Sequence, residues 1–490
     1  MRGPALQVAP PCGKVEKLRA KEVTPVAKTS PSAPRRGMDP ALLRPVFSLA
    51  WPTMLEQLMQ TAVQYIDTAM VGALGTAATA AVGATTTLNW LIICTVSACG
   101  VGFLSVIARA RGAGEGDVVR RAAGQSLLAV LVIGVFYTLL TCSLSRVIPV
   151  WMQVDAPIRA LAGRYFFILY LPMLFRAAAI IFGTVLRAVG DAKTPMRAGI
   201  AANVLNVILN FLLIYPARTV VLFGRSVSLW GAGWGVAGTA AASAVSYTLS
   251  GVIITIAVFR HPELSPRGLS LRPDREILRP WRRVAVPLLV QQFVNCMGYV
   301  VFAAMINALG EISAAAHTIA NTVESAFYIP GYGMQNAAAA LSGAAVGARD
   351  RDRLSALGHT IRTLEVSLML LSGGLLFAFA PNMVRLFTRS GAAIALGSTV
   401  LRMVACSEPF YGVSIVTEGM LQGAGQTRIP LIYNLTGMWG VRIVGTFVCT
   451  RLLGLGLVSA WACMIAHNLL VFSLYLAFLL RGKLDRLAEL

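Results

Sequence analysis

Polar side chains recur at helical spacing inside a long apolar run at residues 46–74. The run contains Glu56, Gln57, Gln60, Gln64 and Asp67. Steps of three and four residues place the stripe from Gln57 to Asp67 on one face of a helix. An acid at the centre of a membrane-spanning helix costs about 2.5–3.5 kcal/mol to insert, so we expect this face to line an interior cavity.

Asp67 is the side chain best suited to chemistry. A carboxylate in a partly desolvated site can exchange a proton or hold Na⁺ near neutral pH. A second interpretation remains open, in which a neighbouring amide or arginine satisfies Asp67 and the acid has no role in transport. Glu56 lies about 16 Å away along the helix axis, either in the same cavity or in water at its entrance.

A second polar face is formed by amides in the apolar run at residues 195–216. Asn203, Asn206 and Asn210 are three and four residues apart. Their carbonyl oxygens can bind a cation, and their amides can equally hold helices together by hydrogen bonds. We predict that these three residues and Asp67 form a cation-coupling group.

Later apolar runs add polar residues to the predicted substrate cavity. Glu324 is central in its run, whereas Glu365 is expected in the wet headgroup region and His317 in ordinary packing. The predicted cavity residues are Glu56, Gln57, Gln60, Gln64, Gln291, Gln292, Asn295, Glu324 and Tyr411. Pro52 and Pro287 lie inside the first apolar run of each half, where a missing amide donor is expected to bend the helix.

The composition shows what must position these residues. Of 490 residues, 56% are hydrophobic and 13% are charged, whereas soluble domains have about 25% charged residues. Twelve apolar segments are long enough to cross a bilayer. They fall at about 46–74, 83–108, 122–147, 157–187, 195–216, 235–259, 281–309, 314–348, 357–381, 394–422, 429–450 and 456–480. The sequence predicts an all-α integral membrane protein of about twelve transmembrane helices.

The two halves of the chain repeat each other at one fixed offset in residue number. Pro52 recurs as Pro287, Gly112 as Gly347, Gly190 as Gly425 and Pro195 as Pro430. Punctuating glycines and prolines at one spacing indicate duplication. Because each copy has an even number of helices, we predict two parallel six-helix lobes related by a pseudo-two-fold axis along the membrane normal.

Charge and proline content divide the chain into four parts. We predict a disordered basic cytoplasmic tail at 1–40, an N-terminal lobe at 41–260, a cytoplasmic linker at 261–280 and a C-terminal lobe with a short tail at 281–490. Lysine and arginine gather in alternate loops, which the positive-inside rule places in the cytoplasm. We therefore expect a multi-pass protein of the cell membrane with both termini cytoplasmic.

Several function classes are disfavoured. The net charge of +21 is spread over short loops, so no nucleic-acid partner is predicted. The chain has neither a G-x-x-x-x-G-K-[ST] loop nor an H-E-x-x-H motif, and its cysteines form no C-x-x-C pair. We predict that it is not an enzyme and that it has no cofactor and no structural metal.

Three segments resemble the multidrug and toxic compound extrusion (MATE) family. They are Tyr65-Ile66-Asp67-Thr68-Ala69-Met70-Val71-Gly72, Leu186-Arg187-Ala188-Val189-Gly190-Asp191-Ala192-Lys193-Thr194-Pro195 and its second copy at 421–430. The resemblance covers about residues 44–480. It implies two lobes that open alternately to either side and expel cationic or amphipathic organic compounds in exchange for H⁺ or Na⁺. It also implies a coupling role for Asp67.

The chain departs from this family's branches at three acidic positions. One branch has an acid in span seven, where this chain has Asn295, and another acid near Tyr411, where this chain has none. A second branch has an acid in span five, where this chain has Asn210. The coupling ion is therefore left open between H⁺ and Na⁺, with Glu324 or Glu56 as substitute acids.

We expect a monomer whose partners are small organic substrates and membrane lipids. The alternatives are a lipid-linked oligosaccharide flippase from the wider superfamily, and a passive channel or receptor.

Overall fold

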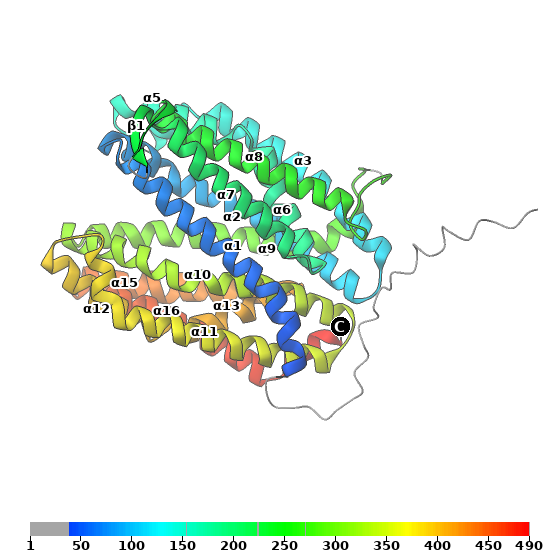
Figure 1. Ribbon diagram of the computed structural model, residues 1–490. Helices are drawn as coiled ribbons and strands as arrows, with labels where there is room; N and C mark the ends of the chain where they lie inside the picture. Colours follow the sequence, from blue (N-terminus) through cyan, green and yellow to red (C-terminus); the bar gives the residue numbers. More distant parts are fainter. Residues whose placement is uncertain (1–38, 153, 223–224, 270, 490) are drawn as a thin grey trace, which may run out of the picture. The chain divides into compact units, whose positions relative to one another are not determined.

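The computed structural model describes residues 39–152, 154–222, 225–269 and 271–489 as a helical bundle with one β-hairpin (Figure 1). The first half contains α1 (Pro40–Gly72), α2 (Thr76–Gly112), α3 (Gly116–Leu144), α4 (Ile148–Trp151), α5 (Ala156–Tyr170), α6 (Met173–Ala188), α7 (Lys193–Leu213) and α8 (Val236–Arg260). The antiparallel hairpin of β1 (Pro216–Leu222) and β2 (Arg225–Ala232) joins α7 to α8.

The second half repeats this order. It contains α9 (Arg275–Asn307), α10 (Glu311–Gly347), α11 (Arg351–Arg385), α12 (Gly391–Ala405), α13 (Glu408–Gly423), α14 (Arg428–Leu435), a π-helix (Thr436–Ile443), α15 (Val444–Phe447), a second π-helix (Val448–Leu452), α16 (Leu457–Leu480) and a 3₁₀ turn (Asp485–Ala488). We call α1–α8 the N-lobe and α9–α16 the C-lobe.

Helices cover all twelve predicted apolar runs, but two runs are broken. The fourth is split into α5 and α6, which meet at an angle of 50°, and the tenth into α12 and α13. Pro172 precedes α6 and Pro409 lies in the first turn of α13, positions where a missing N–H breaks no helical hydrogen bond.

Hydropathy alone identifies fewer spans than the fold contains. Within the described residues, seven helices are long and apolar enough to cross a membrane, or eight if α5 and α6 form one span. Helices α1 and α10 have 33 and 37 residues but are not among the seven. Their interior amides, acids and glycines lower the mean hydropathy.

Three stretches outside the apolar runs can be compared with the elements of the structure. The stretch between the runs at 195–216 and 235–259 forms most of the hairpin at 216–232. The linker was predicted to extend to residue 280, yet α9 begins at Arg275, because the Asp274 carboxylate accepts a hydrogen bond from the Glu276 N–H and caps the helix. The predicted tail at 1–40 lies outside the described residues except for Asp39 and Pro40, which cap and begin α1.

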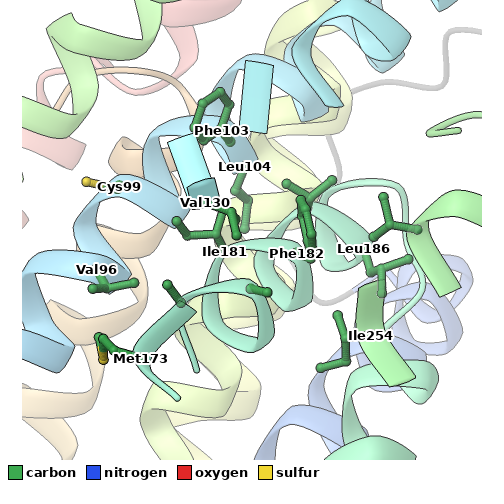
Figure 2. Close-up of a cluster of buried hydrophobic side chains, with 14 of the residues drawn as sticks. Val96, Cys99, Phe103, Leu104, Val130, Met173, Ile181, Phe182, Leu186 and Ile254 are labelled. Carbon is green, nitrogen blue, oxygen red and sulfur yellow. The ribbon is translucent and has the colours of Figure 1, made fainter. Parts of the chain in front are cut away.

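The N-lobe has its own apolar core around α2 (Figure 2). Phe103 and Leu104 of α2 pack with Ile181 and Phe182 of α6, and all four side chains are almost completely buried. The C-lobe buries separate clusters, one of which includes Trp461. A further cluster joins Val46 and Ala50 of α1 to residues of α10, α11 and α13, so the two lobes also share buried apolar contacts.

The lobes meet closely at one end of the bundle. We call this the basic end; it holds the loops at 113–115, 189–192, 261–274, 348–350 and 424–427. Ser105 Oγ on α2 donates to the carbonyl of Gly423 at 3.0 Å, and Trp281 Nε1 on α9 donates to the carbonyl of Cys99 at 3.1 Å. Gly112 lies against the Ala344 carbonyl and Gly347 against the Arg109 carbonyl, with no room for a side chain at either glycine.

Candidate functional site

A chain of hydrogen bonds crosses the N-lobe from α1 to α8. Asn210 Nδ2 on α7 donates to Asp67 Oδ1 on α1, and also to Asn206 Oδ1 at 2.9 Å. Asn206 Nδ2 donates in turn to Ser243 Oγ on α8 at 3.2 Å. The four-residue step between the two asparagines places both amides on one face of α7, towards its neighbours. The structure thus brings Asp67, Asn206 and Asn210 together.

This group offers a carboxylate and free amide oxygen to a cation. Asn206 and Asn210 are buried, Asp67 is partly buried, and Asn210 Oδ1 has no hydrogen-bond donor within the described part of the chain. A carboxylate held away from bulk water is stabilised by binding a proton or a cation. Asn203 Nδ2 is buried without a partner in the same residues, so Asn203 does not join this network.

Glu56 forms an ion pair instead of standing free at an entrance. Its Oε2 atom lies 2.6 Å from Arg187 Nη2 on α6, and the two side chains are 11% and 14% exposed. The pair joins α1 to the segment before the α6–α7 turn. Glu56 is therefore occupied in this conformation.

The equivalent place in the C-lobe is built from amides around a different acid. Gln291 and Gln422 occupy the repeat positions of Glu56 and Arg187. Both donate to Glu418 Oε1, at 2.8 and 3.1 Å, and Asn434 Nδ2 donates to Oε2 at 3.2 Å. Glu418 was not among the predicted site residues, although an acid inside an apolar run was the available signal.

Glu324 lies in a C-lobe region with an unpredicted cation. Glu324 and Arg442 are both buried, and the Arg442 guanidinium packs over the rings of Tyr299 and Phe302, 4.8 and 4.1 Å from their centroids. Arg442 is close enough to Glu324 for electrostatic attraction. The run at 429–450 gave no indication that this arginine would turn inward.

Three tyrosines gather beside Glu324. Tyr411 Oη lies 3.1 Å from Tyr332 Oη, and the Tyr328 ring is 5.8 Å from the rings of both Tyr332 and Tyr411, in edge contacts. Aromatic faces of this kind attract organic cations. Tyr411 was predicted from the sequence, and Tyr328 and Tyr332 were not.

The interpretation of Glu365 as a headgroup residue is wrong. Glu365 and Glu408 are 0% and 1% exposed, and Glu365 Oε1, Glu365 Oε2 and Glu408 Oε2 lack hydrogen-bond partners within the described residues. The Glu365 carboxylate points towards α13 and fills the space beside Gly412, where an added Cβ atom would lie 3.1 Å from Glu365 Oε1. Position along an apolar run does not give the direction of a side chain, which caused the error.

The remaining predicted cavity residues are less tightly organised. Gln60 and Gln64 are exposed on α1, and Gln57, Gln292 and Asn295 are half-buried. No hydrogen bond joins any of these five side chains to the two networks among the residues described. Pro52 is buried in α1 and Pro287 is half-buried in α9, and both helices continue through them.

The backbone carbonyls that lose their helical donor to Pro52 and Pro287 have different surroundings in the two lobes. Pro287 leaves the carbonyl of Arg283 without its helical donor, and Thr427 Oγ1 lies 3.4 Å from this oxygen and 3.1 Å from that of Val284. In the N-lobe, Ala192 stands at the position equivalent to Thr427. The alanine side chain offers no hydroxyl to the Ser48 carbonyl, which Pro52 leaves without its helical donor.

The fold and the carboxylates and amides buried between its helices define a polytopic membrane transporter. The MatE family profile matches residues 52–212 and again residues 287–448. The two matches begin at Pro52 and at Pro287, which are equivalent positions of the internal repeat. The chain belongs to the MatE family, which confirms the resemblance seen in the sequence and the prediction that it is not an enzyme.

Similar proteins cover almost the whole chain. The probable multidrug resistance protein NorM of Thermotoga maritima is 27% identical over 451 residues, which span 92% of this chain and 95% of that protein. The probable multidrug resistance protein YoeA of Bacillus subtilis is 23% identical over 473 residues, 94% and 99% of the two chains.

Solved structures share the fold. An outward-facing MATE family transporter of the MOP superfamily matches with a TM-score of 0.83 at 24% identity, over 91% of this chain and 96% of that one. A MATE protein in a bent conformation matches with a TM-score of 0.81 at 24% identity, over 91% and 97%. These likenesses confirm the predicted membrane fold.

Proposed function

We propose that this protein is a secondary active antiporter that exports cationic or amphipathic organic compounds in exchange for H⁺ or Na⁺. The observation that carries the proposal is the network from Asp67 through Asn210 and Asn206 to Ser243. A partly buried carboxylate that accepts a hydrogen bond from the Asn210 amide, whose own oxygen has no donor in the described residues, suits a site that alternately binds and releases a small cation. The names of the relatives, which refer to multidrug resistance, support this export role.

The duplicated lobe helps to locate the coupling site. The positions equivalent to Asp67, Asn206 and Asn210 are Phe302, Val441 and Gly445. None of these can bind a cation through its side chain, so the coupling group belongs to one lobe only. This asymmetry supports the view that the polar residues are there for transport rather than for folding.

Helix α1 is the part that we expect to move. Cation binding at Asp67 changes the charge that Asn210 stabilises, and so changes how α1 packs on α7. Pro52 weakens the same helix by removing one backbone hydrogen bond. A change at Asp67 can therefore alter the bend of α1 and release the substrate on the opposite side from the basic end.

The C-lobe supplies the features that suit an organic cation. Tyr328, Tyr332 and Tyr411 form an aromatic group, and Glu324 and Glu408 are buried acids beside it. Aromatic rings and carboxylates together favour cationic and amphipathic compounds. A strongly basic interior, as a lipid-linked oligosaccharide carrier would need, is not what these residues form.

The test is transport in proteoliposomes under a pH gradient or a Na⁺ gradient imposed separately. We expect uphill dye movement with one gradient, loss of coupling in Asp67→Asn, and retention of coupling in Asp117→Asn, which removes an exposed acid at the basic end. Gradient-dependent efflux that persists in Asp67→Asn would refute the coupling role. Downhill movement alone would favour a passive channel, and movement of lipid-linked sugars would favour a flippase.

We also propose that the basic end faces the cytoplasm, with both termini on that side, and that the protein works as a monomer. The loops at this end contain most of the loop lysines and arginines, which the positive-inside rule places on the cytoplasmic side. Accessibility of a cysteine placed at Asp117 to an impermeant reagent in intact cells tests the orientation, since labelling from outside would contradict it.

A further inference from the structure

A cavity of about 430 Å³ lies at the basic end, at the junction of the two lobes. It is lined by Arg109 of α2, by Pro280, Arg283 and Val284 of α9, and by residues 424–428, which join α13 to α14. Arg109 comes from the N-lobe and the other lining residues from the C-lobe. The cavity is separate from both polar networks described above.

Three guanidinium groups make this cavity strongly positive. Throughout residues 39–489, apart from the undescribed positions 153, 223–224 and 270, no carboxylate lies within ion-pair distance of Arg109, Arg283 or Arg428. Arg109 Nε donates to the Ser105 carbonyl of its own helix at 3.1 Å. This bond fixes the half-buried side chain and leaves its terminal nitrogens for another acceptor.

The loop is shaped around the Arg109 guanidinium. Gly425 has a φ of +83°, and a Cβ atom at this position would lie 2.9 Å from Arg109 Nη1. A side chain there would displace the guanidinium from the cavity wall. Helix α14 begins at Arg428, so its first N–H groups, which have no acceptors within the helix, lie at the same wall.

The duplicated lobe shows that the fold does not require this charge. The positions equivalent to Arg109 and Arg283 are Ala344 and Ser48, and the position equivalent to Gln426 is Asp191. Lys193 replaces Arg428 there. In the N-lobe, Lys193 and Asp191 stand in this frame, and the Arg111 guanidinium that lies against Gly190 is paired with Glu263. The C-lobe frame has three arginines and no acid paired with them in the described residues. Neither helix packing nor the turn explains the three arginines.

We propose that this cavity binds a phosphate group, either from the headgroup of an anionic lipid or from a soluble phosphate compound. Arginine forms paired, charge-assisted hydrogen bonds to phosphate oxygens, and three of them can surround one group. The volume accommodates a phosphate with its attached substituent. Basic pockets between membrane helices are typical binding sites for lipid phosphates.

Binding would stabilise the conformation in which the basic end is closed. The phosphate would link Arg109 of the N-lobe to Arg283 and Arg428 of the C-lobe. These residues adjoin the lobe contact between Ser105 and Gly423 and the contact between Gly347 and the Arg109 carbonyl. When the lobes separate at this end, Arg109 must move away from Arg283 and Arg428, so the complete site exists only while the basic end is closed.

The experiment measures thermal unfolding of the purified full-length protein in two arms at constant ionic strength. One arm adds inorganic phosphate in detergent, with sodium chloride as the reference. The other compares nanodiscs of phosphatidylglycerol with nanodiscs of phosphatidylcholine. We expect saturable stabilisation in at least one arm. Stabilisation by inorganic phosphate identifies a soluble ligand, and stabilisation only in phosphatidylglycerol identifies a lipid headgroup.

Variants decide whether the cavity is responsible. Arg283→Gln and Arg428→Gln should each weaken the stabilising effect at least five-fold. Gln426→Asp, which copies Asp191 and keeps all three arginines, should do the same, and it covers the case in which an arginine variant does not fold. Arg282→Gln removes an exposed charge one residue outside the cavity and should change the effect less than two-fold. The proposal is overturned by absence of stabilisation in both arms, or by an equal effect of Arg282→Gln.

Discussion

Gly112 and Gly347 each lie in close contact with the opposite lobe. Adding one methyl group at either glycine should therefore shift the equilibrium between the closed and the open basic end. A Cβ atom at Gly112 would lie 2.0 Å from the Ala344 carbonyl oxygen, and one at Gly347 would lie 1.9 Å from the Arg109 carbonyl oxygen. Real Cβ contacts are essentially never shorter than 3.0 Å, so the backbones must separate by about 1 Å. Overpacking of this kind costs about 1–3 kcal/mol.

This cost applies only while the basic end is closed, because the two backbones part when the lobes open there. We therefore expect Gly112→Ala and Gly347→Ala to shift the equilibrium towards the open basic end by about 5- to 150-fold. Spin labels on cysteines at the exposed positions Asp117 and Asp352, with Cys12 and Cys406 replaced by serine, would report the distance between the lobes.

A matched control separates this effect from a general loss of stability. Gly374→Ala adds the same methyl group at an exposed position of α11, where no neighbouring atom lies within 4 Å of the new Cβ. This variant should give the same distance distribution as the wild type. If Gly112→Ala and Gly347→Ala also gave the wild-type distribution, the basic end would not open by separation of these backbones, and the argument would fail.

Other contacts give predictions for thermal unfolding. Glu56→Gln should cost about 3 kcal/mol because Arg187 remains buried without its carboxylate, whereas the double variant with Arg187→Gln should recover most of that loss; an equal loss in both would contradict the ion-pair argument. Glu418→Leu leaves the amides of Gln291 and Gln422 without an acceptor and removes one of the two acceptors of Asn434 Nδ2, so it should cost at least about 3 kcal/mol, with Glu418→Gln losing clearly less. Thr427→Val should cost about 1 kcal/mol by leaving the Arg283 carbonyl uncovered, and an unchanged unfolding temperature would show that water replaces the hydroxyl.

Helix number and the internal repeat could be predicted because they depend on long stretches of sequence. A run of about 20 apolar residues has few alternatives to a spanning helix. The breaks were harder to predict, although Pro172 and Pro409 mark them, because a proline inside a span can also bend a continuous helix, as Pro52 does in α1. The hairpin at 216–232 joins two apolar runs and has no apolar stretch of its own long enough to distinguish it from a loop.

The candidate site was predictable only where one helix face carried several polar residues. Asn206 and Asn210 share a face of α7, so their approach to Asp67 follows from spacing. Arg442 is the one charged residue in the run at 429–450, and Glu365 follows Arg362 by three residues, and neither pattern fixes the direction of the side chain. Whether such a residue faces lipid, water or protein depends on which helices surround it, and that information is in the tertiary packing.

Comparison of equivalent positions in the two copies separates the residues that preserve the fold from those that give each lobe its own chemistry. Gly112 and Gly347 permit the same close approach in both copies, so neither can change without disturbing the contact between the lobes. Asp67 faces Asn210 in one lobe, whereas Phe302 and Gly445 occupy the equivalent places in the other. Burying a carboxylate costs free energy wherever it occurs, and the C-lobe bears that cost at other positions, with Glu324, Glu365 and Glu408 buried there. The position equivalent to Asp67 is used for packing in the C-lobe, whose polar groups lie at these acids, around Glu418 and at the arginine-lined cavity.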